Sequence, residues 1–132
     1  MKKTTIFVIT ALVAAVGYYL YLTGAIFANF ESVAPHQAFE KMKEKNVAIL
    51  DVRTPSEYQQ GHIAGAKLIP VQNLKSRLDE LKPLQGKRVL VYCRSGHRSA
   101  IASRILADNG FKPLNIKGGI NRWVAEGLPV SR

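Results

Sequence analysis

The sequence predicts an α/β domain with a central, mainly parallel sheet flanked by helices, preceded by one hydrophobic N-terminal helix. Two short apolar runs, 47–52 and 88–92, show no alternation of polar residues, which is typical of strands buried on both faces of a parallel sheet. Segments with helical spacing of apolar residues lie between and after them, as a strand–helix alternation requires. The 132 residues suffice for one compact domain after the apolar start.

The N-terminal segment has the length of a membrane span. Residues 4–30 carry no charge, and Ile6–Phe27 is a stretch of 22 mostly apolar residues. At about 1.5 Å per residue, a helix of this length covers ~33 Å, against a hydrocarbon core of ~30 Å. Three tyrosines lie near its far end, where an aromatic belt would meet the headgroups: Tyr18, Tyr19 and Tyr21.

Two interpretations of this segment stay open. An uncleaved anchor explains the length, whereas a secretory signal has an apolar core of only ~7–15 residues followed by a small-x-small cleavage site. Thr23-Gly24-Ala25 is an acceptable site of that kind. We therefore predict a signal-anchor or signal peptide over residues 1–28, with the span at about 6–27, and a folded domain over 29–132.

Charge flanking the span predicts its orientation. Lys2 and Lys3 directly precede it, so the positive-inside rule places the N-terminus in the cytoplasm and the domain on the outer face, which is the periplasm in a bacterium. Cleavage would instead give a soluble periplasmic protein. The net charge is +10, with 19 Lys and Arg against 9 Asp and Glu, and it favours anionic partners.

The elements of the domain follow from apolar spacing and caps. Leu74, Leu78 and Leu81 have the i, i+4, i+7 spacing of a helix, and Asn109-Gly110 is a typical helix end. A buried Trp123 is expected to hold the last helix on the core. In chain order we predict helix 35–45, strand 47–52, helix 74–81, strand 88–92, helix 100–109, strand 113–116 and helix 120–126.

The candidate chemistry lies in one loop. Strand 88–92 leads into Cys93-Arg-Ser-Gly-His-Arg-Ser99, and a helix is expected to begin near Ala100. Ligands bind at the carboxyl ends of strands in open α/β sheets, and a glycine-containing loop before a helix can wrap its N–H groups around an anion. The same field favours an anionic sulfur. Cys93 is the single cysteine of the chain and is the predicted nucleophile.

The other loop residues are predicted to bind the substrate. Arg94, His97 and Arg98 offer side-chain donors to an oxyanion, although at least one of the arginines is expected to serve solubility or a structural ion pair instead. A solvated imidazole explains His97 equally well. The substrate-binding set is Arg94, Ser95, Gly96, His97, Arg98 and Ser99.

Two further groups have structural interpretations. Asp51 and Arg53 at a strand end, with Glu57 four residues beyond Arg53, predict an ion-pair and capping arrangement that supports the site from outside the loop. The Gly118-Gly119 pair either shapes the rim of the pocket or forms a plain turn. We predict no metal site, because His62 has no second ligand at a useful spacing.

At these residues the sequence resembles the rhodanese family of sulfurtransferases, in particular its single-domain members. Three stretches carry the resemblance: DVRTPSEYQQGHIAGA from Asp51 to Ala66, CRSGHRS from Cys93 to Ser99, and KGGINRW from Lys117 to Trp123 with a following Gly-Leu-Pro. The resemblance implies a three-layer rhodanese-like domain. It also implies covalent, ping-pong catalysis with no metal or organic cofactor.

The implied reaction moves sulfane sulfur through a Cys93 persulfide. A thiosulfate-type donor gives up its outer sulfur to Cys93, and a cyanide or thiol acceptor, which includes a protein thiol, takes it away. The implied partners are therefore a small anionic sulfur donor and a thiophilic acceptor, together with the membrane through the N-terminal segment.

Other functions remain as alternatives. A non-catalytic rhodanese-like interaction module tethered to the membrane would not need the intact cysteine. Cysteine phosphatases use a C-x5-R loop, whereas Arg98 follows Cys93 as C-x4-R and Ser99 holds the C-x5-R position. An arsenate reductase would also need a second, resolving thiol. Nucleic-acid binding is not expected, because the basic residues are dispersed and lack an aromatic stacking platform.

Overall fold

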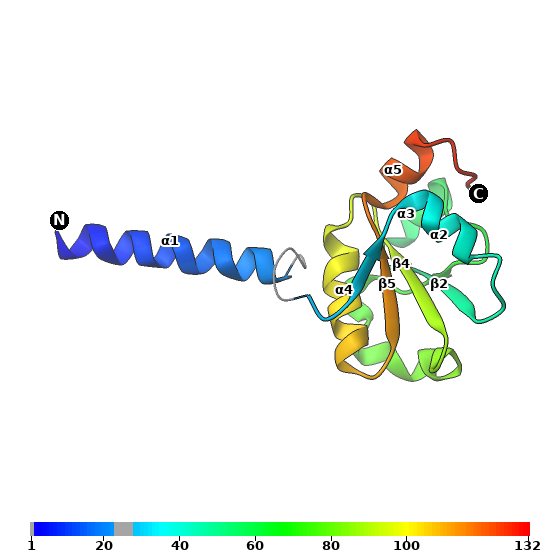
Figure 1. The fold of residues 1–132 in the computed structure, drawn as a ribbon, viewed down its shortest axis with the longest axis horizontal. Helices are drawn as coiled ribbons and strands as arrows, with labels where there is room; N and C mark the ends of the chain where they lie inside the picture. The colour runs from blue at the N-terminus through cyan, green and yellow to red at the C-terminus, as the bar shows by residue number, and fades with distance from the viewer. Residues whose placement is uncertain (1, 23–27) are drawn as a thin grey trace.

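The computed structural model describes residues 2–22 and 28–132. In the second range, a five-stranded parallel sheet lies between two layers of helices (Figure 1). This confirms the predicted α/β class and its parallel sheet. Across the sheet, the strand order is β1 (Glu31–Val33), β5 (Lys112–Ile116), β4 (Arg88–Tyr92), β2 (Val47–Asp51) and β3 (Lys67–Leu68).

The central strand β4 contributes to both layers of the core. Val89 and Val91 pack in the cluster that contains α4, whereas Leu90 and Tyr92 pack in the cluster that contains Trp123. Successive side chains of a strand point to opposite faces, so a strand covered on both faces is apolar throughout. The helices are α2 (Pro35–Lys41), α3 (Pro55–Gln60), α4 (His97–Asp108) and α5 (Gly119–Ala125), with 3-10 segments at Val71–Asn73 and Lys75–Leu84.

Several predicted boundaries were wrong. The helix expected over 35–45 ends at Lys41, because residues 43–46 offer no apolar side chain to extend its buried stripe. The helix expected over 74–81 is a 3-10 segment with non-helical dihedral angles at Arg77 and with Pro83 inside it. The short elements β1, α3 and β3 were missed, since two to six residues show no clear period.

The last helix is fixed on the sheet as expected. Trp123 is fully buried, and its indole Nε1 donates a hydrogen bond to the carbonyl of Pro129 at 2.8 Å. The chain beyond Pro129 then pairs with the segment after α3, where His62 and Ser131 exchange two backbone hydrogen bonds. The C-terminal residues thus close over α3 and α5, on the side of the sheet opposite α4.

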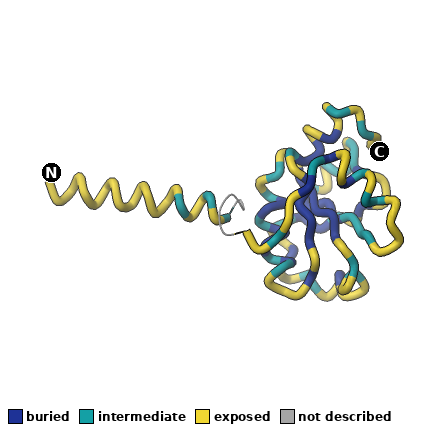
Figure 2. The backbone as a smooth tube through the Cα atoms, viewed as in Figure 1, coloured by how far each residue is buried: buried dark blue, intermediate teal, exposed yellow. Residues whose placement is uncertain are grey.

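The apolar N-terminal helix α1 (Lys3–Leu22) extends away from the domain and has no buried residue (Figure 2). It is long and apolar enough to cross a membrane, as a membrane anchor or a signal sequence would be. Its length of 20 residues corresponds to about 30 Å. The candidate cleavage site Thr23-Gly24-Ala25, like the end of the expected span, lies outside the described residues.

Candidate active site

The candidate nucleophile lies where the fold predicts a ligand site. Cys93 directly follows β4 at the carboxyl edge of the sheet, and α4 begins four residues later, at His97 rather than near Ala100. Gly96 is the residue before the helix, with φ of 107°, a conformation that suits glycine and turns the chain early. His97, Arg98 and Ser99 therefore lie in the first turn of α4 and not in a loop.

The sulfur of Cys93 is held inside this turn. The residue is 1% exposed, and the backbone N–H of Gly96 donates to Sγ at 3.1 Å. The Ser99 hydroxyl lies 3.4 Å from Sγ and 3.2 Å from the Gly96 carbonyl. The sulfur thus accepts one backbone N–H and contacts a hydroxyl that itself donates to the Gly96 carbonyl, at the N-terminus of a 12-residue helix.

The N-terminus of a second helix, α5, contacts the outer side of the same loop. The N–H groups of Ile120 and Asn121, in the first turn of α5, donate to the carbonyls of Cys93 and Arg94 at 2.9 and 3.1 Å. In a trans peptide the N–H points opposite to the C=O, so the next amides of the loop point away from α5. A Cβ at Gly119 would lie 2.4 Å from the Cys93 carbonyl oxygen, which requires glycine there.

Arg98 is engaged by a carboxylate from α3. Its Nη1 and Nη2 donate to Oε1 and Oε2 of Glu57 at 2.7 and 2.9 Å. Glu57 also takes part in a capping box with Thr54, the residue before α3. Hydrogen bonding from Arg98, opposed by partial burial and aided by Thr54, lowers the pKa of Glu57 to about 2. The pair therefore stays ionised and ties α4 to α3.

Asp51 and Arg53 form the buried ion pair expected at the end of β2. Asp51 is fully buried, and its carboxylate accepts the Arg53 backbone N–H at 2.9 Å and the Arg53 guanidinium at 2.7 Å. Arg53 Nη2 also donates to the Gly61 carbonyl at 2.7 Å. Asp51 lies beside Tyr92 in the sheet, so this pair supports the chain next to Cys93. Glu57 pairs with Arg98 rather than with Arg53.

The remaining predicted residues lie on the surface of the site. Arg94 and Ser95 are exposed, and His97 is exposed with its ring stacked on Tyr19 of α1 at 5.7 Å. Arg94 lines a pocket of about 540 Å³ together with residues of α3, α5 and the C-terminal segment. Within residues 2–22 and 28–132, no ion pair is formed by Arg94, so it supplies a positive charge that no carboxylate neutralises.

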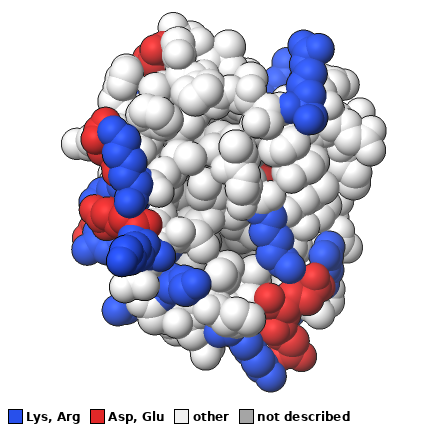
Figure 3. Space-filling model, turned by 90° about the vertical axis from the view of Figure 1, so that its right-hand side faces the viewer, with Lys and Arg blue, Asp and Glu red and all other residues white. Residues whose placement is uncertain are grey.

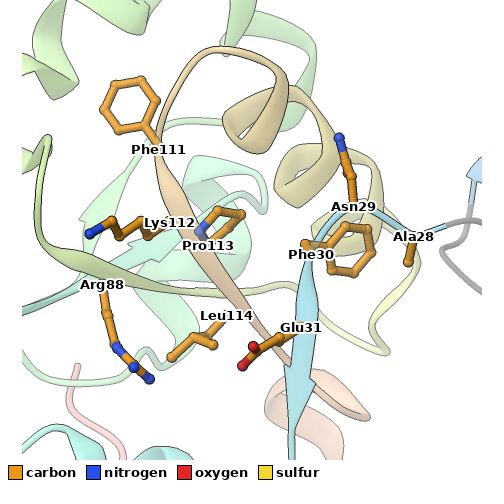
Figure 4. A pocket seen from close by; sticks show the side chains of 9 residues that line it. All are labelled: Ala28, Asn29, Phe30, Glu31, Arg88, Phe111, Lys112, Pro113 and Leu114. Atoms are coloured by element: carbon orange, nitrogen blue, oxygen red, sulfur yellow. The ribbon is translucent and has the colours of Figure 1, made fainter.

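Charge elsewhere on the domain is scattered. On the side facing away from α1, Lys and Arg side chains form separate patches, several beside Asp or Glu, around a mostly uncharged centre (Figure 3). Another cavity, of about 450 Å³, lies at the amino ends of β4 and β5, beside Arg88 and Lys112 (Figure 4). Because Cys93 follows the opposite end of β4, this cavity is separate from the candidate site.

Comparison with known proteins identifies the class of the domain. The model of the rhodanese-like domain family matches residues 34–126, and the chain belongs to this family. Among solved structures, a rhodanese-related protein from Thermoplasma volcanium superposes with a TM-score of 0.71 at 33% identity, over 77% of this chain and 98% of that one.

Curated relatives carry more particular names. The chain is 38% identical over 87 residues to a protein named sulfurtransferase from Allochromatium vinosum. The matched region covers 65% of this chain and 79% of that protein. It is also 38% identical over 71 residues to the thiosulfate sulfurtransferase PspE of Escherichia coli, over 54% of this chain and 68% of PspE.

Two features of the site were missed in the sequence. The contact of Glu57 with Arg98 joins residues 41 positions apart, and a separation of that size leaves no periodic signal. The amides of Ile120 and Asn121 were missed because backbone donors are not encoded by residue type. The Gly118-Gly119 pair was the available signal, and Gly119 lies against the backbone of Cys93 and Arg94.

The buried pair at β2 yields a stability prediction. Asp51→Asn is expected to destabilise the domain by about 3–5 kcal/mol in urea unfolding, because it leaves the Arg53 charge buried without its partner. The matched control is Asp79→Asn, which removes a carboxylate that is 91% exposed and paired with Lys82. Its effect should stay below about 0.5 kcal/mol. Similar losses in both variants would refute the role given to Asp51.

Glu57 yields a pH prediction. Its pKa lies below the ordinary value of 4.5, so its contribution to stability is complete above pH 4.5 and is lost as the pH falls through about 2. Urea unfolding of the wild type should therefore lose about 2–3 kcal/mol from this group on acidification, and Glu57→Gln should lose less over the same range. Parallel pH profiles of the two proteins would contradict the ion pair.

Proposed function

We propose that this chain is a thiosulfate-type sulfurtransferase that carries sulfane sulfur on Cys93. The observation that carries the proposal is the arrangement of the buried sulfur, which accepts the Gly96 N–H at the N-terminus of α4. The relatives named sulfurtransferase support the general activity. A small, enclosed turn lined by donors suits one anionic sulfur atom.

The reaction proceeds in two displacements. The Cys93 thiolate attacks the outer sulfur of thiosulfate, the sulfur–sulfur bond of the donor breaks, and sulfite leaves with the electron pair. The resulting persulfide carries its negative charge on the outer sulfur. The Gly96 N–H stays on Sγ, and we assign stabilisation of the outer sulfur to the other N–H groups of the turn and to the N-terminus of α4. A cyanide ion then attacks that outer sulfur, thiocyanate departs, and Cys93 returns to its thiolate.

The charged residues have different parts in this scheme. Arg94 is exposed beside the pocket and attracts the doubly charged donor. Arg98 shares its charge with Glu57, so we assign it mainly to positioning the first turn of α4. The remaining members of the predicted set, Ser95 and His97, form the exposed rim of the turn.

The N-terminal helix bears on where in the cell this activity takes place. We propose that α1 stays attached as a signal-anchor, with Lys2 and Lys3 on the cytoplasmic side and the domain, residues 29–132, on the outer face. In a bacterium that face is the periplasm. A cleaved signal, which would release a soluble periplasmic domain, is the alternative, and the intact mass of the protein purified from membranes distinguishes the two.

A phosphatase or arsenate reductase is the less favoured enzyme. The position that would hold the phosphate-binding arginine is Ser99, whose hydroxyl lies 3.4 Å from the sulfur. The loop from Cys93 to Arg98 has the form C-x4-R and is one residue shorter than the C-x5-R loop of cysteine phosphatases. A non-catalytic interaction module remains the alternative of another class, and it predicts a folded protein without turnover.

Cys93→Ser tests the proposal directly. The variant should lose thiocyanate formation from thiosulfate and cyanide completely, because it lacks the nucleophile, and it should unfold at nearly the wild-type urea concentration. After thiosulfate alone, the wild type should gain about 32 Da, the mass of one sulfur atom, and the variant should not. A folded wild type that shows neither turnover nor this adduct would contradict the sulfurtransferase and favour the non-catalytic interaction module.

Arg94→Gln tests the electrostatic part. Loss of one charge contact worth about 1 kcal/mol should raise the KM for thiosulfate roughly fivefold, with a smaller effect on a singly charged thiosulfonate donor. Arg88→Gln is the matched control, because it removes the same charge at the opposite end of β4. Equal effects of Arg94→Gln on the two donors, or an equal effect of the control, would exclude steering by Arg94.

A further inference from the structure

The junction between α1 and the domain is packed on α4. The Tyr19 ring stacks on His97 with 5.7 Å between centroids and 22° between planes. The Arg104 guanidinium lies 3.8 Å from the centre of the Tyr21 ring and donates a hydrogen bond to the Tyr21 carbonyl. On the other side of residues 23–27, the Phe30 ring lies 6.0 Å from the same guanidinium. Both flanking segments therefore contact one helix.

The length of α1 fixes where this junction lies relative to a bilayer. Its 20 described residues cover about 30 Å, which equals the thickness of a hydrocarbon core. When α1 spans the membrane, its last turn must therefore lie at the headgroups, where Tyr19 and Tyr21 are favoured. The residues of α4 that contact these tyrosines lie at the same depth.

The direction of α4 follows from the same contacts. Tyr19 and Tyr21 differ by about 3 Å in rise along α1, whereas their partners His97 and Arg104 are separated by about 10.5 Å along α4. The helices thus cross, and Figure 1 shows α4 running across the axis of α1. If α1 stands along the membrane normal, α4 lies parallel to the membrane surface.

The side of α4 turned toward α1 combines half-buried apolar residues with charged ones, of which Arg104 is buried against the Tyr21 ring. Five residues of α4, at positions 97, 101, 104, 105 and 108, are separated by four, three, one and three positions, which places them on one helical face. Ile101 and Ile105 are half-buried at the centre of this face, and His97 and Asp108 are exposed toward its ends. The α4 face consists of His97, Ile101, Arg104, Ile105 and Asp108.

We propose that the α4 face rests on the membrane surface and presents the Cys93 site at the headgroup layer to an acceptor thiol held at that surface. The acceptor part rests on the proposed function. The acceptor thiolate attacks the outer sulfur of the Cys93 persulfide, the bond between the two persulfide sulfurs breaks, and its electron pair stays on Cys93. The acceptor leaves as a hydropersulfide, and no external oxidant or reductant is needed.

A depth measurement tests the orientation. Full-length Cys93→Ser protein in nanodiscs of phosphatidylethanolamine and phosphatidylglycerol receives one new cysteine, by Ile101→Cys on the α4 face or by Lys43→Cys as the control. Lys43 is exposed and lies beyond the end of α2. A fluorophore at position 101 should be quenched several-fold more by nitroxide-labelled headgroups than one at position 43. Equal quenching at both positions would overturn the proposal.

A variant that removes the contacts between α1 and α4 distinguishes this orientation from mere attachment of the domain near the membrane. Tyr19→Ala with Tyr21→Ala removes both aromatic contacts from α1 and leaves its length unchanged, so quenching at position 101 should fall to the level of position 43. Undiminished quenching would contradict docking through these tyrosines. An intact mass that shows loss of the N-terminal segment by cleavage after Ala25 would likewise overturn the proposal.

The acceptor is tested with one thiol in two forms. In otherwise wild-type protein in nanodiscs, a mercaptopropionyl group on a lipid headgroup should be persulfidated several-fold faster, at equal bulk concentration, than the same thiol in solution. The tyrosine double variant should reduce this ratio. Cyanide turnover is the reference: its absence from the wild type overturns the proposed function, whereas normal cyanide turnover with equal rates for both thiols overturns only the membrane-bound acceptor.

Discussion

The site depends on the contact between the Cys93 turn and the first turn of α5. Two α5 amides bind the carbonyls of Cys93 and Arg94, and Gly119 allows an approach that any side chain would block. With their carbonyls fixed on one side, the peptides of the turn direct N–H groups to the other. The Gly96 N–H, which belongs to the peptide that follows these two, donates to the sulfur, and this donor is in place without any contribution from a side chain.

Around this turn, two arginines form structural ion pairs. Arg53 is neutralised by Asp51, and Arg98 by Glu57, and each pair joins segments that enclose the site. Arg94 differs because it is exposed at the pocket. The net charge of the protein is thus a poor guide to its function, whereas the charge that lacks a partner at the site is informative.

Helix α4 contacts α1 and also begins beside the candidate nucleophile. Arg104 is 8% exposed and lies between Tyr21 of α1 and Phe30 of the segment that leads into β1. The same helix supplies, at its other end, the N-terminus that faces the Cys93 sulfur. In the proposed arrangement, α4 therefore joins the proposed anchor to the candidate nucleophile.

The sequence alone determined the class of the fold and proposed the position of the candidate nucleophile. Apolar runs such as 88–92 indicate strands covered on both sides because apolar residues occupy both faces of the strand, and a single cysteine after such a strand leaves one candidate nucleophile. Tertiary structure decided the roles around it. Glu57 reaches Arg98 across 41 residues, Gly119 matters through a contact with Cys93, and His97 meets Tyr19. These contacts join distant segments, so no local period or propensity records them.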